Sequence, residues 1–316
     1  MVSDDLARRF LHVNLNCDSL RVTEALYVGA LGLSVRMRTD HSVPTNGAIL
    51  GMDDETFCET AFFYDSRGGR DGCALEAIEF HDPGLKRDSN TDPTRPGIRA
   101  ALMWVADLDT TAGVLRNSGI PVGDPVDGLI SGVKAVLAVD ADGVVVELAQ
   151  CPPDVDAPNG ALFSGVRISA INAVATAEFL TTIGFAEVEA PTTMTIASDQ
   201  LAPGAAADSA ECVVARFALP EDAHRFTVSV VQHPDTVAQE PVPWGGNRQG
   251  LYRCALRVES VDEALAALPD SVEVRGDPVW CPLPGTKIEG LYIAFLRSPD
   301  GVVFEFVERP LAFFSR

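Results

Sequence analysis

A repeated hexapeptide near the end of each half of the chain constrains the fold more than any other feature. The sequence DGVVVE at 142–147 recurs as DGVVFE at 300–305, an offset of 158 residues. Upstream, one apolar run opens at Gly97 and another at Gly250, an offset of 153 residues. Landmarks in the same order at similar offsets indicate a duplicated unit of about 155 residues. The chain is therefore expected to hold two similar halves.

Each half divides again into two segments that share one order of elements. Residues 10–17 alternate like a strand, and residues 18–30 follow with helical spacing until Gly32 ends the helix. Strand-like runs come next, at 33–38, 48–52, 60–64 and 74–80. The other three quarters repeat the order of strand, helix and strands. The sequence therefore predicts four βαβββ modules.

A stretch that is unsuited to regular structure separates the halves. Residues 151–160 read CPPDVDAPNG, and the prolines and the closing Asn-Gly disfavour both helix and strand. We therefore predict a first domain at 1–152, a linker at 153–160 and a second domain at 161–316. Each domain is expected to hold two consecutive modules.

The composition argues against two classes of partner. The formal net charge is −21 at pH 7, so the surface repels nucleic-acid phosphates and anionic lipid. Nucleic acid and membranes are therefore not expected as partners. Hydrophobic residues make up 47% of the chain, which is enough to build real cores.

The cellular compartment is predicted from the cysteines and the apolar runs. No apolar run approaches the roughly 18 residues of a membrane helix, and the start of the chain has no apolar signal-peptide core. None of the seven cysteines stands at CxxC spacing, which disfavours a zinc knuckle or a redox pair. These features predict a reduced, cytoplasmic protein.

Several stretches of the sequence match one family pattern. FLHVNLNC at 10–17 is followed by a predicted helix and then by Leu31–Gly32–Leu33. DGVVVEL and DGVVFEF each place a Glu after an Asp-Gly turn and an apolar run. Over about residues 8–152 and 162–310 the chain resembles the vicinal oxygen chelate superfamily. That superfamily includes glyoxalase I, bleomycin-resistance proteins and extradiol dioxygenases. The resemblance implies an α+β fold, in which four βαβββ modules pair into two curled mixed-sheet domains around small-molecule pockets.

The resemblance also implies two metal-ligand positions in each module, a His or Gln on the first strand and a Glu on the last. In the first half they fall on His12 and Glu76, and on Ala100 and Glu147. His12, Glu76 and Glu147 are therefore expected to converge and to hold a divalent ion, either Fe, Mn, Co, Ni or Zn. Glu76 or Glu147 is then the candidate catalytic base. The alternative is a metal-free polar cluster in a ligand-binding cavity.

The second half departs from this pattern. Its ligand positions fall on Gly165 or Val166, Ser229, Arg253 and Glu305. A guanidinium has no acceptor atom, so Arg253 cannot ligate a metal, but it can donate two parallel hydrogen bonds to a carboxylate. We predict a direct ion pair between Arg253 and Glu305 in a domain that binds no metal. The missing His, His and Glu set disfavours extradiol ring cleavage.

Two functions remain open at the level of the sequence. The first is an enzyme of isomerase, lyase or cyclase type, in which a divalent metal acts as a Lewis acid on an oxygenated organic substrate. The second is a metal-free protein that sequesters a small ligand, as bleomycin-resistance proteins do. The partners expected in either case are a small organic molecule and, as an open option, a second copy of the chain in a homodimer.

Overall fold

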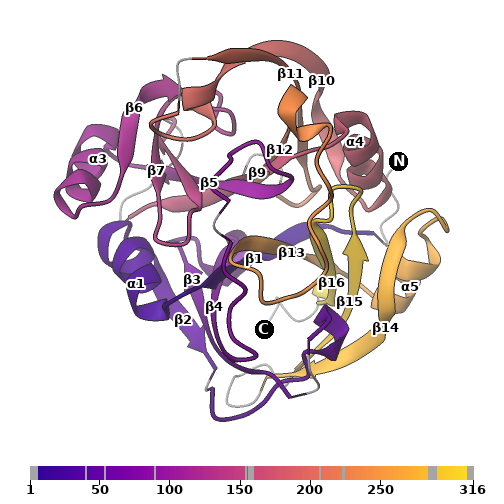
Figure 1. Ribbon diagram of the computed structural model, residues 1–316. Coiled ribbons are helices and arrows are strands. Elements are labelled where there is room, and N and C mark those ends of the chain that lie inside the picture. Colours follow the sequence, from indigo (N-terminus) through magenta and orange to yellow (C-terminus); the bar gives the residue numbers. More distant parts are fainter. Residues whose placement is uncertain are drawn as a thin grey trace.

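Two eight-stranded mixed sheets form the framework of the protein, which is described here from a computed structural model (Figure 1). The structure describes residues 6–39, 41–52, 55–88, 90–153, 155, 160–205, 208–222, 225–283 and 290–311. Helices are few, and each lies between strands of a mixed sheet. The α+β class predicted from the sequence is therefore confirmed.

Each quarter of the chain forms the predicted βαβββ module. The first module consists of β1 (Arg9–Cys17), α1 (Leu20–Glu24), the π-helix η1 (Ala25–Ala30), β2 (Ser34–Arg38), η2 (Ala48–Leu50), β3 (Phe57–Tyr64), α2 (Gly68–Asp71) and β4 (Ala74–Asp82). The second consists of β5 (Gly97–Val105), α3 (Leu108–Asn117), β6 (Val122–Asp127), β7 (Lys134–Val139) and β8 (Val145–Gln150). The third consists of β9 (Leu162–Ser169), α4 (Ala173–Thr182), β10 (Ala186–Ala197), η3 (Ser198–Gln200), β11 (Ser209–Ala218), β12 (Thr227–Gln232) and η4 (Pro234–Thr236). The fourth consists of β13 (Gly250–Val258), α5 (Val261–Ala266), β14 (Glu273–Pro282), β15 (Gly290–Arg297) and β16 (Val303–Glu308).

Local sequence signals set the ends of the helices. The side chains of Asp107, Asn172 and Ser260 accept hydrogen bonds from backbone N–H groups in the first turns of α3, α4 and α5, as N-cap residues do. Gly32 has a φ of 76° just beyond η1, a backbone conformation that glycine adopts at little cost. The run at 48–52, predicted as a strand, contains the 3₁₀ turn η2 instead.

The pairing of the modules differs from the prediction that consecutive modules share a sheet. The first sheet has the order β14-β15-β16-β13-β1-β4-β3-β2, so it joins the first and fourth modules. The second sheet has the order β10-β11-β12-β9-β5-β8-β7-β6 and joins the second and third. Antiparallel pairing of β1 with β13 joins the two modules of the first sheet at its centre, and antiparallel pairing of β5 with β9 does the same in the second sheet.

Two long connections make this arrangement possible. Residues 82–96 carry the chain from the first sheet to the second, and residues 233–249 carry it back. The two connections run beside each other, with an isolated parallel bridge between Lys86 and Arg248. The predicted linker at 153–160 joins β8 to β9 within one sheet, and its residues 154 and 156–159 lie outside the described residues. The domain boundaries at 1–152 and 161–316 thus remain a prediction about the duplicated sequence, because they are not the bounds of the two sheets.

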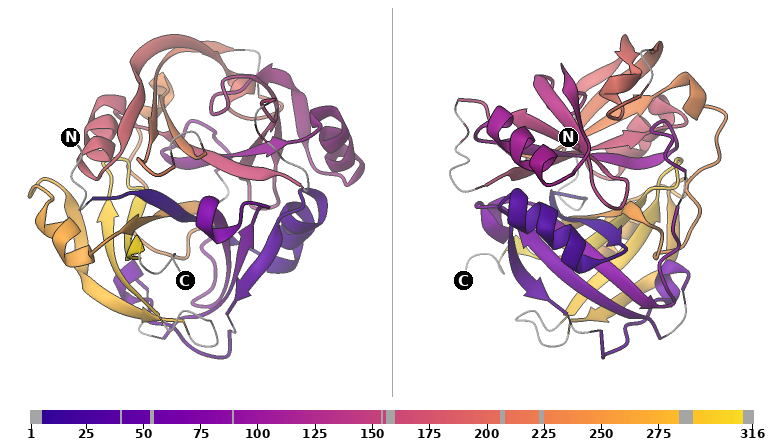
Figure 2. Two further views of the ribbon diagram at one scale, coloured as in Figure 1. Left: turned by 180° about the vertical axis from the view of Figure 1, so that it is seen from behind. Right: turned by 60° about the vertical axis from the view of Figure 1, so that its left-hand side comes forward.

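One hydrophobic core lies between the two sheets, which stack one above the other in the right-hand view of Figure 2. Phe10 on β1 of the first sheet packs against Phe185 and Phe226 of the third module, with ring centroids 5.7 Å and 4.3 Å away. Because this core covers one face of each sheet, the opposite face of each sheet is the one that can hold a site.

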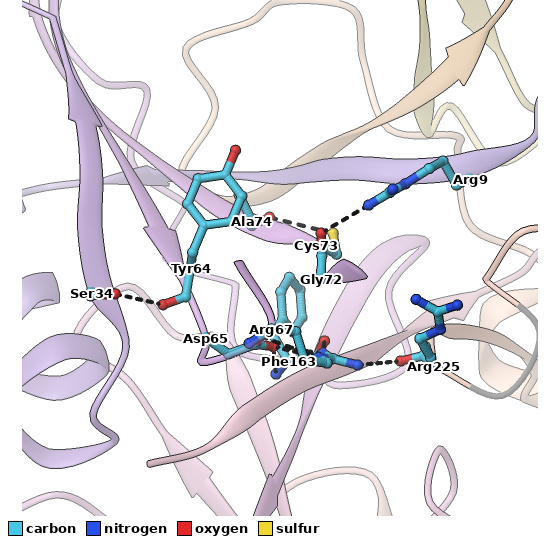
Figure 3. Close-up of polar contacts among 10 residues, drawn as sticks. All are labelled: Arg9, Ser34, Tyr64, Asp65, Arg67, Gly72, Cys73, Ala74, Phe163 and Arg225. Atoms are coloured by element: carbon cyan, nitrogen blue, oxygen red, sulfur yellow. Dashed lines mark hydrogen bonds and ion pairs between the residues drawn. The ribbon is translucent and has the colours of Figure 1, made fainter. Parts of the chain in front are cut away.

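Polar contacts also fix the first module to the second sheet (Figure 3). Asp65, which is buried after β3, accepts a hydrogen bond of 3.0 Å from the backbone N–H of Phe163 on β9. Arg67 donates to the same Asp65 carboxylate and, at 2.6 Å, to the carbonyl of Phe163. This paired contact holds the turn between β3 and β4 against β9.

None of the described helices is both long and apolar enough to span a bilayer.

Candidate functional site

A cavity of about 330 Å³ and a smaller one of about 120 Å³ lie on the face of the first sheet that is turned away from the core. They share a group of lining residues from the first and fourth modules: Phe62, Glu76, Arg253, Cys281, Leu283 and Glu305. The larger volume is within the range of sites for small organic molecules. This face of the sheet therefore carries the candidate site.

Strand register places the polar side chains at the centre of this sheet. Asn14 on β1 lies opposite Glu76 on one side and opposite Arg253 on the other. His12 lies two residues from Asn14, and alternate residues of a strand project from the same face. Glu305 reaches the same region from β16, where it pairs with Ala255.

Arg253 connects the two carboxylates. Its Nε donates a hydrogen bond of 2.8 Å to Oε2 of Glu305, and its Nη2 donates one of 2.9 Å to Oε2 of Glu76. All three side chains are at least nine-tenths buried. The predicted ion pair between Arg253 and Glu305 is present, and Glu76 is a second partner that the sequence did not predict.

His12 completes the group but is not hydrogen-bonded to it. Its Nε2 lies 3.4 Å from Oε2 of Glu76 and 3.8 Å from Oε2 of Glu305. Within the part of the chain that the structure describes, this buried nitrogen has no partner with hydrogen-bond geometry. The imidazole packs edge-on against Phe62 at 5.4 Å and lines the smaller cavity.

The guanidinium of Arg253 and the two carboxylates partly neutralise one another. Burial alone would raise the pKa of Glu305, but Arg253 and then His12 favour its ionised form, so its pKa lies below the ordinary value. The two carboxylates likewise outweigh burial at Arg253 and raise its pKa. One guanidinium therefore faces two carboxylates, and the group carries a net charge of about −1 when His12 is neutral.

Two cysteines that line the larger cavity are weak nucleophiles. Burial raises the pKa of Cys58, and it raises the pKa of Cys281 to about 11. Since the thiolate is the reactive form, these thiols are protonated at neutral pH and belong to the apolar wall.

The donor set of this group does not fit a divalent metal. Three of its four members, His12, Glu76 and Glu305, are residue types that ligate such ions. The fourth is a guanidinium, which stands between the carboxylates and already bonds to one oxygen of each. A guanidinium offers no lone pair to a cation, so Arg253 takes the place that a metal would need.

Glu147 lies in the second sheet, so the three predicted ligands do not converge. Leu102 on β5 lies opposite both Glu147 and Gly165, just as Asn14 lies opposite Glu76 and Arg253 in the first sheet. Glu147 thus occupies the position equivalent to Glu76, but in the other sheet. The structure brings His12 and Glu76 together and leaves Glu147 out.

A loop of the chain fills the equivalent face of the second sheet. Glu147 accepts hydrogen bonds from the backbone N–H groups of Ile130, at 3.1 Å, and Ser131, at 2.7 Å. The side chain of Ile130 lies over Gly165, where an added Cβ would come within 2.8 Å of it. We call residues 128–131 the plug loop. Through these hydrogen bonds, Glu147 holds the plug loop against the second sheet.

One further group of metal-binding residue types was missed by the sequence analysis. The ligand atoms of His41, Glu59 and His81 all lie within 4.8 Å of one another, outside the two cavities. His41 follows β2, whereas the other two lie on neighbouring strands, so no short sequence motif joins them.

The sequence nevertheless contained a signal for the group around Arg253. Of the eight ligand positions, those of the first and fourth modules hold His12, Glu76, Arg253 and Glu305, whereas the second and third modules hold only Glu147 as a charged residue. Charged residues at facing positions must neutralise one another if they are buried. This asymmetry would have favoured pairing of the first module with the fourth.

Comparison with known proteins supports the fold. No family model matches the chain, and no curated protein matches it. Glyoxalase I from Zea mays aligns over 98% of this chain and 94% of its own, with a TM-score of 0.67 and 16% identity. A proposed dioxygenase from Bacillus subtilis aligns over 96% of this chain and 86% of its own, with a TM-score of 0.60 and 14% identity. At such identities the likeness shows the fold alone, and this chain has the fold of the vicinal oxygen chelate superfamily.

Proposed function

We propose that this protein binds a small organic molecule in the cavity of the first sheet, without a metal ion at the centre. The observation that carries this proposal is the Arg253 guanidinium, which bonds to both Glu76 and Glu305. A divalent ion at this centre would first have to displace a buried cation from two carboxylates. The metal-free reading of the sequence is therefore the better supported one.

The lining of the larger cavity indicates the class of ligand. Most of its wall is apolar, with side chains from both modules: Ile49, Leu50, Met52, Ile78, Phe80, Ile293 and Phe295. Its inner end is formed by the group around Arg253, whose two carboxylates outnumber the guanidinium. An anionic group placed there would meet unfavourable charge. We therefore propose a mainly apolar ligand with a neutral or cationic hydrogen-bond donor at one end.

A metal-free enzyme is the second candidate, and His12 is the observation that favours it. The Nε2 of His12 is buried and has no hydrogen-bond partner among the described residues. An imidazole in this state can accept a proton from a bound substrate. Isomerase, lyase or cyclase chemistry would then depend on His12, with Glu76 as a base only if Arg253 releases it. Glu147 has no part in such a reaction, because it lies in the other sheet.

Binding of the neutral dye Nile red to the purified protein tests the proposal. The dye should bind with a blue-shifted emission, and Ile49→Trp should weaken binding at least tenfold, because Ile49 lines the cavity from the half-buried turn η2. Val114→Trp is the matched control, since it adds the same side chain at an exposed position on α3. Equal affinities in the two variants, or no binding by the wild type, would contradict a ligand cavity at this position.

A further inference from the structure

We propose that His41, Glu59 and His81 form a binding site for one divalent transition-metal ion, such as Zn²⁺ or Co²⁺, at the edge of the first sheet. We call these three residues the rim site. One ligand atom from each lies within 4.8 Å of the other two. The two imidazole rings are in contact, with centroids 4.8 Å apart. Two of the five histidines of the chain are thus brought together beside a carboxylate.

The donor chemistry suits such an ion. Imidazole nitrogen and carboxylate oxygen bind zinc at about 2.0–2.2 Å, and two His with one carboxylate leave coordination positions open for water or a ligand. Ligand atoms around one ion lie within about 3.5 Å of each other at these bond lengths. The rim-site atoms, which lie within 4.8 Å of one another, would therefore have to approach by at most about 1.3 Å, and the side chains of His41 and His81 are exposed.

The fold supplies each ligand from a different place. His41 lies in the loop after β2, Glu59 on β3 and His81 on β4. His81 falls at the register shift between β3 and β4, where Phe57 pairs with Asp82 and Cys58 with Phe80. An extra residue in one strand redirects a side chain, and such bulges are common beside functional sites.

Arg38 holds the carboxylate of the rim site in place. Its Nη1 donates a hydrogen bond of 2.5 Å to Oε1 of Glu59. No hydrogen bond from a described residue reaches the other oxygen of Glu59, and a partner that orients a ligating carboxylate is usual around metal ions. The arrangement thus provides both the three ligands and one of the groups that orient them.

The rim site lies beside a wall of the larger cavity. The loop that carries His41 continues into Val43, Thr45, Asn46 and Gly47, which line that cavity. An ion bound by the rim site would tie the start of this loop to β3 and β4, and so restrict the motion of the wall. This site is separate from the group around Arg253, and its existence does not depend on the ligand proposed for the cavity.

Zinc titration by calorimetry tests the site on untagged, full-length protein that has been stripped with a chelator. The wild type should bind about one Zn²⁺ per chain, and His41→Ala and His81→Ala should each weaken binding at least tenfold. His233→Ala is the matched control. The Nδ1 of His233 also lies beside a carboxylate, 3.7 Å from Oδ2 of Asp235, but His233 directly follows β12 of the second sheet and is not part of the rim site. Its affinity for Zn²⁺ should equal that of the wild type.

Two spectroscopic readouts complete the test. Co²⁺ should give a visible absorption band typical of nitrogen ligation in the wild type and the His233→Ala variant, and lose it in His81→Ala. Hydrogen exchange of the amides at 41–47 should slow when Zn²⁺ is added to the wild type alone. Glu59→Gln provides a third ligand variant if one of the histidine variants melts early. Retention of wild-type affinity by the folded ligand variants, or the absence of stoichiometric binding, would overturn the proposal.

Discussion

Arg253 donates a hydrogen bond of 2.8 Å from its Nε to Oε2 of Glu305, and this pair lies on the central and neighbouring strands of the first sheet. The same guanidinium bonds to Glu76 at 2.9 Å from the other module. A single cation thus joins the two modules that are furthest apart in the sequence. Four predictions follow from this contact and from the carboxylates placed elsewhere in the fold.

Replacing Arg253 should destabilise the protein strongly. In Arg253→Ala, two buried carboxylates lose the guanidinium that bonds to both of them, and breaking a buried pair in this way costs about 3–5 kcal/mol. Arg87→Ala is the control, because Arg87 pairs with Asp18 at an exposed position, where such pairs contribute about 0–1 kcal/mol. Urea denaturation measures both. A loss of less than about 1 kcal/mol for Arg253→Ala would show that the pair is effectively solvated.

Arg253→His should create a metal site at the centre of the first sheet. The change replaces the guanidinium by an imidazole beside His12, Glu76 and Glu305, which together are two nitrogen and two carboxylate donors of the kind that transition metals bind. Made in a His81→Ala background, the variant should retain about one Zn²⁺ per chain after dialysis, as measured by elemental analysis. Failure to retain zinc would show that more than Arg253 excludes a metal from this centre.

Glu147→Gln should weaken the fold without affecting the cavity. The carboxylate accepts backbone hydrogen bonds from the plug loop, and an amide cannot accept them as well while one end presents N–H donors. We expect a loss of about 1–3 kcal/mol of stability and unchanged affinity for Nile red. Reduced dye affinity in a variant of wild-type stability would instead place Glu147 in the ligand site.

Asp140 should make stability fall between acid and neutral pH. Burial raises its folded-state pKa to about 7, above the value of about 3.9 expected in the unfolded chain. The folded state therefore binds the proton more tightly than the unfolded chain does. The stabilising effect of this bound proton is complete below about pH 4 and is lost as the pH rises to about 7.

The variant Asp140→Asn isolates this effect. Relative to Asp140→Asn, the wild type should lose roughly 2–4 kcal/mol of stability over that pH range, as followed by chemical denaturation at each pH. Asp124→Asn, at an exposed position of β6, should follow the wild type throughout. Parallel curves for the wild type and Asp140→Asn would mean that Asp140 is ionised in the folded state across the range.

Local patterns in the sequence predicted the modules because local interactions determine them. Alternation, helix caps and glycine stops fixed the order of elements in each quarter, and the repeat of DGVVVE and DGVVFE placed Glu147 and Glu305 on their strands. The ion pair of Arg253 with Glu305 was also predictable, since both residues belong to one module.

The choice of partner for each module could not be predicted in the same way. Pairing of β1 with β13 depends on contacts between residues about 240 positions apart, such as Asn14 and Arg253, and no local pattern records such contacts. The expected convergence of Glu147 with His12 failed for this reason alone. The rim site escaped prediction because its residues are brought together by a register shift and a loop.

The pairing of the first module with the fourth has a consequence for biosynthesis. Residues 97–232 contain every strand of the second sheet, so this sheet can assemble while the ribosome is still translating the rest of the chain. The first module emerges earlier, but the edge of β1 that pairs with β13 has no partner until residues 250–258 leave the exit tunnel. Within the nascent chain, the amino-terminal module is therefore synthesised first and completed last, and chaperones that shield exposed strand edges would act on β1 during that interval.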